Sequence, residues 1–477
     1  MARENASESL IELRVFLATI ILLGILIIVA GAASYLIPAG NLTESISDGQ
    51  TIHTYARIDQ TPVPVWKIAL SPLMCVTGKN GPKIVVLILF ILIIGGSFAV
   101  MNNSGILPKM LSDLVGRFAH QKRLFLVINV LIFSLLGSCL GILEEIVPMI
   151  LIFVPLAYRM GWDATTGMAI PFLSAGFGFA AATFNPFTVG TAQKLADVPL
   201  FSGLALRLPF FCITTTVVAL YLLYYTRKIE KDPSKSASYA FDEKIRKKIK
   251  AAVVPDFQGS AKGAMLWMGL CFFLIAGVVL SGPVVPVVQD LAFPLIALIF
   301  LVMGIGVGLM AGGGVKRAFG HFFRGLADFA PAIVLILMAA AVGYLIEVGN
   351  VLDTILFTIS NLTQSLGKQA AVLLIYIFQM LMNMLVPSGT GQAVLTIPIL
   401  APLGDMIGIT RQTVVLAYQF GDGFSNLIWP TNPMLLIAIG LAGINYRSWF
   451  RFVLPIQVVL MGLCILFLMI AVNIHFS

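Results

Sequence analysis

The sequence predicts an all-α polytopic membrane protein built as an inverted repeat, and three observations support this. Of the 477 residues, 59% are hydrophobic and 11% are charged, whereas an average soluble domain has about 25% charged residues. Lys and Arg are concentrated in a few short clusters between apolar runs. One pattern also occurs twice without a gap, 247 residues apart: Pro155, Gly161, Asn185 and Pro186 match Pro402, Gly408, Asn432 and Pro433.

Four basic clusters orient the helices, because the cytoplasmic loops of membrane proteins are rich in Lys and Arg. The clusters lie within 109–123, 227–262, 316–324 and 447–451. Placing all four inside gives a multi-pass protein of the cytoplasmic (inner) membrane with a cytoplasmic N-terminus. The net charge of +8 then follows from membrane topology, and we expect no nucleic-acid partner.

Two apolar runs open the first half, and each is close to the ~20 residues that cross a bilayer as a helix. We expect helices over 15–37 and 84–101, joined by an external polar segment, 39–83. Amphipathic stretches follow at 106–115 and, in the second half, at 351–359. We interpret each as a helix lying in the membrane interface; the alternative is that each extends the helix before it.

The stretch 124–160 has to leave the cytoplasm and return, because basic residues flank it on both sides. Its second apolar run, 146–159, is too short to cross at about 1.5 Å per residue. We therefore predict a re-entrant hairpin. A helix over 167–197, broken at Asn185-Pro186, then leads outward, and a helix over 205–226 returns.

A basic linker, 227–262, and a single helix, 263–281, separate the two copies. One crossing between them reverses the second copy, so its hairpin enters from outside. In the second half, 263–477, we expect helices over 291–311, 330–348 and 450–472, a hairpin over 370–406 and a broken helix over 412–443. With the first half, 1–226, this gives about nine transmembrane helices, two re-entrant hairpins and two broken helices.

The two hairpin tips and the two breaks form the candidate site. Backbone that leaves a helix inside the bilayer must be satisfied by protein, water or ligand, and matched interruptions in two halves are typical of a transport site. The candidate substrate-binding residues are Glu144, Glu145, Asn185, Pro186, Thr188, Ser388, Gly389, Thr390, Gln392, Asp422 and Asn432. Na⁺ is expected near Gly141, Asn185, Ser388, Asp422 or Asn432. The alternative interpretation is a pair of proline kinks in ordinary helices.

Three carboxylates lie near the predicted centre, Glu144, Glu145 and Asp422. An acidic side chain at mid-membrane costs at least about 2.5 kcal/mol on insertion scales, so it indicates function. The balance suits a cation, which is Na⁺, a proton, or the ammonium or guanidinium group of a substrate. One glutamate can instead face water or cap the second helix of its hairpin. Ala175 stands where the second copy has Asp422.

Other chemistries find little support. There is no phosphate-binding Gly-x-x-x-x-Gly-Lys-Ser/Thr motif for ATP-driven transport. The four His are scattered, and no metal-ligand spacing occurs. An intramembrane hydrolase with Ser388 as the nucleophile lacks an apparent base, so we do not expect an enzyme. A channel with the same breaks is the other alternative.

Four motifs carry a family resemblance: Ile37-Pro38-Ala39-Gly40, Glu144-Glu145-x-x-Pro148, Thr183-Phe184-Asn185-Pro186-Phe187-Thr188-Val189-Gly190 and Pro387-Ser388-Gly389-Thr390-Gly391. The chain resembles the YfcC family of the anaerobic C4-dicarboxylate carrier (DcuC-like) group in the ion transporter superfamily. That superfamily includes arginine/ornithine antiporters and AbgT-type aminobenzoyl-glutamate transporters. The resemblance implies a homodimer with a scaffold domain in each protomer. It also implies a mobile domain of two hairpins and two broken helices that moves by an elevator mechanism.

The expected function is secondary active transport of a small amino acid or organic carboxylate, coupled to Na⁺, H⁺ or exchange and needing no other cofactor. The paired Ser-Asn-Thr signatures of the sodium–dicarboxylate branch are absent from this chain. Glu144 and Glu145 at one tip are poor hosts for a dianion. A basic amino acid such as arginine or ornithine fits this charge better, and a C4-dicarboxylate is the alternative for the same fold.

Overall fold

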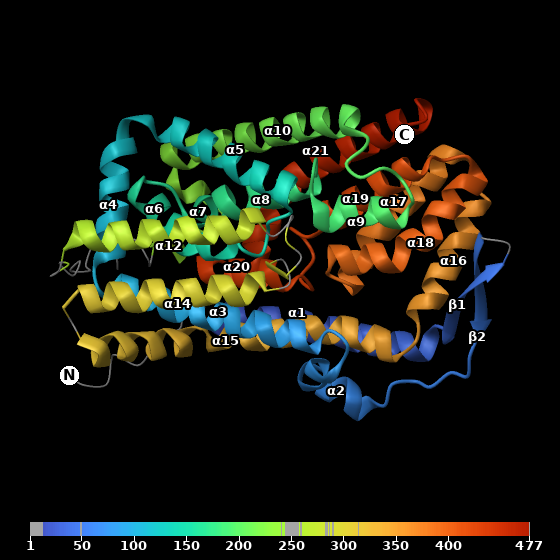
Figure 1. The fold of residues 1–477 in the computed structure, drawn as a ribbon, viewed down its shortest axis with the longest axis horizontal. Helices are drawn as coiled ribbons and strands as arrows, with labels where there is room; N and C mark the ends of the chain where they lie inside the picture. Colours follow the sequence, from blue (N-terminus) through green and yellow to red (C-terminus); the bar gives the residue numbers. More distant parts are fainter. Residues whose placement is uncertain are drawn as a thin grey trace.

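The chain folds almost entirely into helices that run along the long axis of the molecule (Figure 1). The computed structural model describes residues 13–47, 50–239, 241–243, 257, 260–281, 285, 287–288, 291–312 and 314–476. The predicted cytoplasmic N-terminus and much of the predicted linker, 227–262, lie outside these residues. Ten helices within them are long and apolar enough to cross a membrane.

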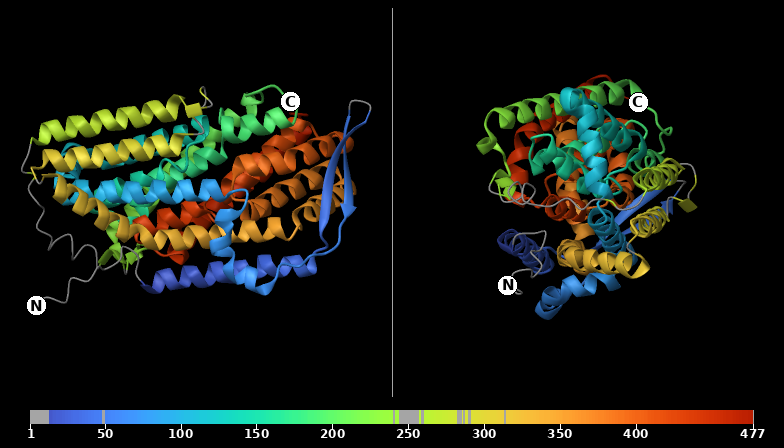
Figure 2. Two further views of the ribbon diagram at one scale, coloured as in Figure 1. Left: turned by 60° about the horizontal axis from the view of Figure 1, so that its bottom comes forward. Right: turned by 90° about the vertical axis from the view of Figure 1, so that its left-hand side faces the viewer.

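Six helices form one layer of the molecule, which we call the scaffold. They are α1 (Leu13–Leu36), α2 (Val65–Met74), α3 (Gly81–Asn103), α12 (Ala261–Ser281), α14 (Ala292–Met310) and α15 (Gly314–Val348). α15 packs against α1, α2, α3 and α14, and α12 covers α14. Seen end-on, the scaffold lies along the bottom and one side of the remaining helices (Figure 2).

The prediction of an all-α chain is wrong at one place. The segment 39–83 contains two antiparallel strands, β1 (Gly40–Ser47) and β2 (Gln50–Arg57), as well as α2. Tyr55 of β2 stacks on Phe357 with ring centroids 4.2 Å apart. The sequence-based reading treated polar composition as loop, whereas the strands are held by each other and by this contact.

Two short helices cross from the scaffold to the rest of the molecule, α4 (Ile106–Phe118) and α16 (Leu352–Gln364). They lie at opposite ends of the long axis (Figure 1). Each begins after a left-handed residue, Gly105 (φ 84°) or Asn350 (φ 51°). They are therefore separate helices and do not extend α3 and α15; their position in a membrane interface stays a prediction.

The remaining helices form a second layer, which we call the core. It contains α10 (Leu204–Lys231), α21 (Tyr446–Asn473) and two helix–turn–helix pairs. The first pair is α5 (Lys122–Leu140) with the 3₁₀ turn Val147–Met149 and α6 (Ile150–Arg159), and the second is α17 (Lys368–Leu385) with α18 (Gly389–Ile407). These pairs occupy the predicted hairpins, 124–160 and 370–406, and re-entry into a membrane stays a prediction.

Both predicted helix breaks are present in the core. Before the first break lie α7 (Ala164–Met168), a π-helical turn and α8 (Ser174–Ala180). A non-helical stretch forms the break. The helix then resumes with a second π-helical turn, Pro186–Gly190, and α9 (Thr191–Leu195). The second divides α19 (Arg411–Ser425) from α20 (Pro433–Ala442). The resumed helices, 186–195 and 433–442, match residue for residue at the offset of 247.

The two copies exchange partners in the core. α5 packs on α8 and α17 packs on α19, within their own copies, but α6 packs on α20 and α18 packs on α9. The broken helices meet through matched positions: Gly176 faces Leu427, and Gly423 faces Ala180. Because α4 and α16 enter this arrangement from opposite ends, it is the geometry expected of an inverted repeat.

Helix bounds agree with the sequence prediction to within a few residues except in α10 and α15. The helix predicted over 205–226 continues to Lys231, so the first basic residues of the predicted linker, 227–262, belong to α10. Seven of the ten long helices coincide with the predicted unbroken crossings, namely α1, α3, α10, α12, α14, α15 and α21, and three are arms of the helix pairs, α5, α17 and α18. The predicted helix 330–348 is wrong at its start, because α15 begins at Gly314 and includes Lys316 and Arg324. Pro331 lies within it. The number of crossings stays a prediction.

The start of the linker is docked on the core. Asp163, the N-cap of α7, accepts a hydrogen bond from Tyr225 Oη at 2.6 Å. Asp242 accepts one from Tyr158 Oη at 2.8 Å. Ser236 Oγ lies 2.7 Å from Asp163 Oδ2 and 2.6 Å from Asp242 Oδ2. Ser236 Oγ thus bridges the two carboxyl groups and ties the start of the linker to α7.

Candidate functional site

The tips of both helix pairs meet the first break. Asn185 is fully buried, and its Oδ1 accepts hydrogen bonds from the amides of Phe187 (2.9 Å) and Thr188 (3.2 Å). It thereby caps the resumed helix, as Asn commonly does. At the first tip, a Cβ added to Gly141 (φ 70°) would lie 2.3 Å from Asn185 Oδ1. Only glycine allows this tip to approach the break so closely.

The second tip covers the same break. Ser388 caps α18, accepting a hydrogen bond from the Gly391 amide at 3.3 Å. Thr390 Oγ1 donates to the Phe187 carbonyl at 2.8 Å. A Cβ added to Gly389 would lie 2.7 Å from Thr188 Cγ2 and 2.9 Å from Asp422 Oδ2. The tip therefore brings Thr188 of one copy and Asp422 of the other to a single glycine.

Asp422 is the chemical centre of this junction. It is completely buried in the last turn of α19, and neither carboxylate oxygen has a hydrogen-bond partner among the described residues. Thr188 Oγ1 and Asn185 Nδ2 are likewise buried without partners in that part of the chain. Native proteins rarely leave buried polar atoms unsatisfied. The cluster therefore has the properties of a binding site for a group that is both polar and cationic.

Polar side chains of the second copy hold Asp422 in place. Asn383 Nδ2 donates to the Asp422 carbonyl (2.9 Å), to Ser425 Oγ (2.7 Å) and to Asn426 Oδ1 (3.0 Å). Tyr418, one turn before Asp422, donates to the Gly389 carbonyl at 2.6 Å. These bonds connect α17, α19 and the tip of α18.

The second break is closed by its own asparagines. Asn432 Oδ1 accepts from the Met434 amide at 2.9 Å, which caps α20. Its Nδ2 donates to Asn426 Oδ1 at 2.9 Å. Asn426 Oδ1 also accepts from Asn383, so this break is linked to Asp422 through one side chain.

A family model described as C4-dicarboxylate anaerobic carrier matches residues 16–473, nearly the whole chain. This protein belongs to the C4-dicarboxylate anaerobic carrier family. It is therefore a multi-pass membrane protein of a transporter family, as the sequence motifs predicted.

Two relatives can be compared in sequence. The chain is 33% identical over 389 residues to a protein of Escherichia coli (strain K12) named "Putative basic amino acid antiporter YfcC", covering 79% of this chain and 75% of that protein. It is 29% identical over 408 residues to an uncharacterized protein of Haemophilus influenzae, covering 84% and 77% of the two chains.

Two solved transporters overlap the chain along most of its length. The YdaH transporter of Alcanivorax borkumensis has 18% identity and a TM-score of 0.43, covering 96% of this chain and 98% of that one. MtrF of Neisseria gonorrhoeae, described in its title within a class of antimetabolite efflux pumps, has 17% identity and a TM-score of 0.42, covering 96% and 95%.

In this family member, Glu144 and Glu145 lie in the turn between α5 and α6 and are half-buried. Lys83, at the start of α3, is close enough for its charge to act on Glu144. The sequence interpretation counted no cation near this tip, because Lys83 is distant in the chain and belongs to the scaffold. The scaffold therefore supplies part of the charge balance at the first tip.

The other predicted site residues divide into two groups. Asn185, Thr188, Gly389, Thr390 and Asp422 come together, with Pro186 opening the resumed helix and Ser388 capping α18. Gln392 does not join them in this structure: its Nε2 donates to Gln379 Oε1 at 2.7 Å, across the α17–α18 pair. Asn432 serves the second break. Among the described residues, no group of three or more His, Cys, Asp or Glu side chains could hold a metal ion.

The sequence reading missed Asn383 and Tyr418. Asn383 could have been found from two signals in the sequence. It is a polar residue within an apolar run, and the matching position of the first copy, 247 residues earlier, is the apolar Leu136.

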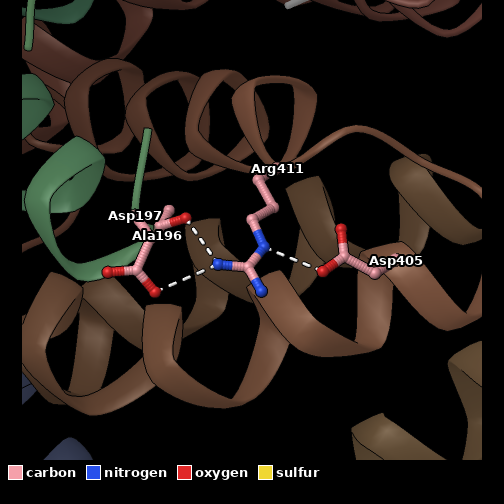
Figure 3. Close-up of polar contacts among 4 residues, drawn as sticks. All are labelled: Ala196, Asp197, Asp405 and Arg411. Atoms are coloured by element: carbon pink, nitrogen blue, oxygen red, sulfur yellow. Dashed lines mark hydrogen bonds and ion pairs between the residues drawn. The ribbon is translucent and has the colours of Figure 1, made fainter. Parts of the chain in front are cut away.

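An arginine clasp joins three core segments near the end of α18. Arg411 Nε donates to Asp405 Oδ2 at 2.8 Å, and its Nη1 donates to the Ala196 carbonyl (2.9 Å) and to Asp197 Oδ2 (3.1 Å) (Figure 3). The three side chains are 31%, 48% and 84% exposed for Arg411, Asp405 and Asp197. The clasp fastens the start of α19 to the ends of α9 and α18.

Proposed function

We propose that this protein is a secondary active transporter of a small solute that carries a cationic group, with a basic amino acid such as arginine or ornithine as the first candidate. It would act in the cytoplasmic membrane with its N-terminus inside. The observation that carries the proposal is Asp422, a fully buried carboxylate whose two oxygens lack partners among the residues that the structure describes. An isolated buried carboxylate is costly, and a bound cation or proton removes that cost.

The rest of an amino acid also has complementary groups at this junction. α18 begins at Gly389, beside Asp422. The N-terminus of a helix carries partial positive charge and favours a carboxylate. A zwitterion with its cationic end at Asp422 and its carboxylate at the start of α18 would thus be held at both ends. The name of the Escherichia coli relative, a putative basic amino acid antiporter, agrees with this assignment.

Coupling would use the same carboxylate. Na⁺ or H⁺ at Asp422 competes with, or alternates with, the cationic group of the solute, which is the requirement for exchange. The Thr188 hydroxyl and the Asn185 amide nitrogen, which have no partner in the described part of the chain, supply a neutral donor and acceptor beside the charge. No further cofactor is needed for this chemistry.

For the transport step we propose that the core moves as a body against the scaffold, as an elevator. Two features support this. α4 and α16 join the layers at opposite ends of the molecule (Figure 1). The face between α15 and α20 is largely apolar, with Leu335, Ala339 and Leu436 packed together. A homodimer formed through the two scaffolds would hold them still during this motion.

A C4-dicarboxylate is the second candidate, favoured by the description of the family model and by Lys83 near the first tip. The two candidates predict opposite responses at Asp422. Neutralising it removes the partner of a cationic solute but relieves repulsion of a dianion.

The test is uptake of labelled arginine, ornithine, succinate and malate into proteoliposomes, with and without a Na⁺ gradient and with unlabelled solute inside. We expect saturable arginine or ornithine uptake with counterflow, and its loss in Asp422→Asn. Asp405→Asn, a carboxylate at the exposed clasp, is the matched control and should transport. Uptake of succinate alone, unchanged in Asp422→Asn, Glu144→Gln and Glu145→Gln, would overturn the proposal. Conduction without saturation or counterflow would indicate a channel.

A further inference from the structure

A second buried charge lies in the first turn of α10, away from Asp422. Arg207 is 3% exposed. Its Nη2 donates to the Ser202 carbonyl, whereas its Nε and Nη1 are buried without a partner among the described residues. A guanidinium group has five N–H donors and no acceptor. Leaving a buried charged donor unpaired costs more than leaving a neutral one, so this site lacks an acceptor.

The neighbouring polar groups among the described residues do not supply that acceptor. Gln193 Nε2 (3.1 Å) and Gln412 Nε2 (3.0 Å) donate to the Ser202 carbonyl that Arg207 also uses. A carbonyl oxygen has two lone pairs, and here three donors converge on it. Gln193 Oε1 accepts from the Phe201 amide at 2.6 Å. Gln412 Oε1 accepts from Gln193 Nε2 at 3.2 Å and from Ser202 Oγ at 3.4 Å. Among the described residues, neither oxygen is a partner of Arg207 Nε or Nη1. The cluster has more donors than acceptors.

Carboxylates from neighbouring segments are already engaged. Asp197, just after α9, and Asp405, at the end of α18, both bind Arg411 (Figure 3). Two arginines thus lie close to the α9–α10 connection with opposite environments. Arg411 is partly exposed and has two carboxylates, whereas Arg207 is buried and has one carbonyl oxygen.

The cluster is also tightly closed. Gly203 (φ 74°) precedes α10, and a Cβ added there would lie 2.4 Å from Gln412 Nε2 and 2.5 Å from Phe476 Cζ. Phe476 is itself buried. Gly203, Gln412 and Phe476 therefore pack closely together at the start of α10.

We propose that Arg207 anchors a binding site for a small monovalent anion, chloride or a short monocarboxylate, between the start of α10 and the start of α19. The anion accepts from Arg207 Nε and Nη1 and relieves the excess of donors around Ser202. It bridges the connection after α9 in the first copy to Gln412 in the second. The site is independent of the solute site, since it binds the opposite charge through different residues.

The test is the thermal unfolding midpoint of the purified protein in detergent, at fixed Na⁺ concentration and ionic strength, as gluconate is replaced by chloride or by acetate. Because a ligand that binds only the folded state raises its stability by mass action, we expect the midpoint to rise by several degrees and to saturate with the small anions. Gluconate is the larger comparison anion, and we expect it to bind more weakly where the side chains around Gly203 pack so closely. A rise with chloride alone or acetate alone identifies which anion is bound.

Three variants decide the matter. Arg207→Gln should unfold at the same temperature in every anion, and Arg411→Gln, the exposed counterpart, should keep the response of the original protein. Gln412→Glu places a carboxylate beside the Ser202 carbonyl, so it should raise the midpoint in gluconate and abolish the anion response, even if Arg207→Gln does not fold. An original protein that is insensitive to the anion, or an undiminished response in Arg207→Gln or Gln412→Glu, would overturn the proposal.

Discussion

Phe177 and Phe424 occupy the same position in the two copies of the repeat and pack against each other, with ring centroids 5.7 Å apart. Each lies on its own broken helix, α8 or α19. A contact between matched positions lies on the local symmetry axis relating the copies, because the operation exchanges its two members. The axis of the core therefore passes between these rings, beside the reciprocal contacts of Gly176 and Gly423.

Gly423→Ala should destabilise the core. The added Cβ would lie 2.4 Å from Ala180 Cα, and a backbone atom cannot move aside as a side chain can. We expect a loss of about 1–3 kcal/mol, typical of overpacking, measured as a lower thermal midpoint. Gly269→Ala in α12 is the control, because nothing lies within 4 Å of its Cβ and alanine favours the helix. Equal midpoints for the two variants would contradict the close approach of α19 and α8.

Asn383→Leu should weaken transport by about tenfold, because removing hydrogen bonds from buried partners costs about 1–3 kcal/mol. The substitution leaves Ser425 and Asn426 without their shared donor and frees α19 to shift at Asp422. The measurement is the concentration dependence of uptake into proteoliposomes. Asn129→Leu is the matched control, since Asn129 donates to the Phe125 carbonyl of its own helix. Transport by Asn383→Leu at the rate of this control would show that the network is dispensable.

Docking of residues 232–239 and 241–243 on the core should weaken as pH rises. Burial, and then the neighbouring Asp163, raise the pKa of Asp242 above its ordinary value. The docked state therefore binds more protons than the released state between the ordinary and the raised pKa, and its stability falls as pH rises through that interval. Ser236, Ser238 and Tyr158 donate to this carboxylate and oppose the shift.

Hydrogen–deuterium exchange of this segment across a pH series, corrected for intrinsic exchange rates, measures the docking. We expect the corrected exchange rate of the segment to be severalfold higher above the raised pKa of Asp242. In Asp242→Asn, the corrected exchange rate should not depend on pH. Asp232→Asn, at an exposed turn of the same segment, should behave as the original protein. A pH response that survives in Asp242→Asn would assign the proton to another group.

Arg411→Gln should cost little. Partly exposed ion pairs contribute about 0–1 kcal/mol each and are screened by salt, and the partner carboxylates of Arg411 are 48% and 84% exposed. We expect the thermal midpoint to fall by a few degrees at low salt and to approach that of the original protein at high salt. A large loss that persists at high salt would mean that the bond to the Ala196 carbonyl, rather than the ion pairs, holds the clasp.

The helix breaks were predictable because the signals are local. Asn185-Pro186 and Asn432-Pro433 combine a capping side chain with a residue that cannot donate within a helix, and the repeat gave each motif a second occurrence. The convergence of the hairpin tips and the breaks was expected from the repeat, and Gly141, Thr188, Gly389 and Asp422 all lie around the first break. The part played by Asn383 was not predicted, since its hydrogen bonds reach about 40 residues along the chain.

Other features depended on contacts that no local pattern contains. The strands at 40–57 are polar, and their pairing and the stacking of Tyr55 on Phe357 join segments far apart in sequence. Lys83 comes near enough for its charge to act on Glu144 only once the scaffold and core are assembled. Likewise, Gln392 was expected at the site from its position beside the tip, and α18 turns it toward Gln379.

The exchange of partners between the copies has a consequence for biosynthesis. α9 leaves the ribosome about 200 residues before its partner α18, and the stretch of chain between α6 and its partner α20 is longer still. Contacts of such long sequence separation form late, because the entropy of closing the intervening loop must be overcome first. The first copy therefore has to remain inserted but incompletely packed until the second arrives. A truncated chain ending in the central linker should accordingly be sensitive to intramembrane quality control, however stable the finished protein is.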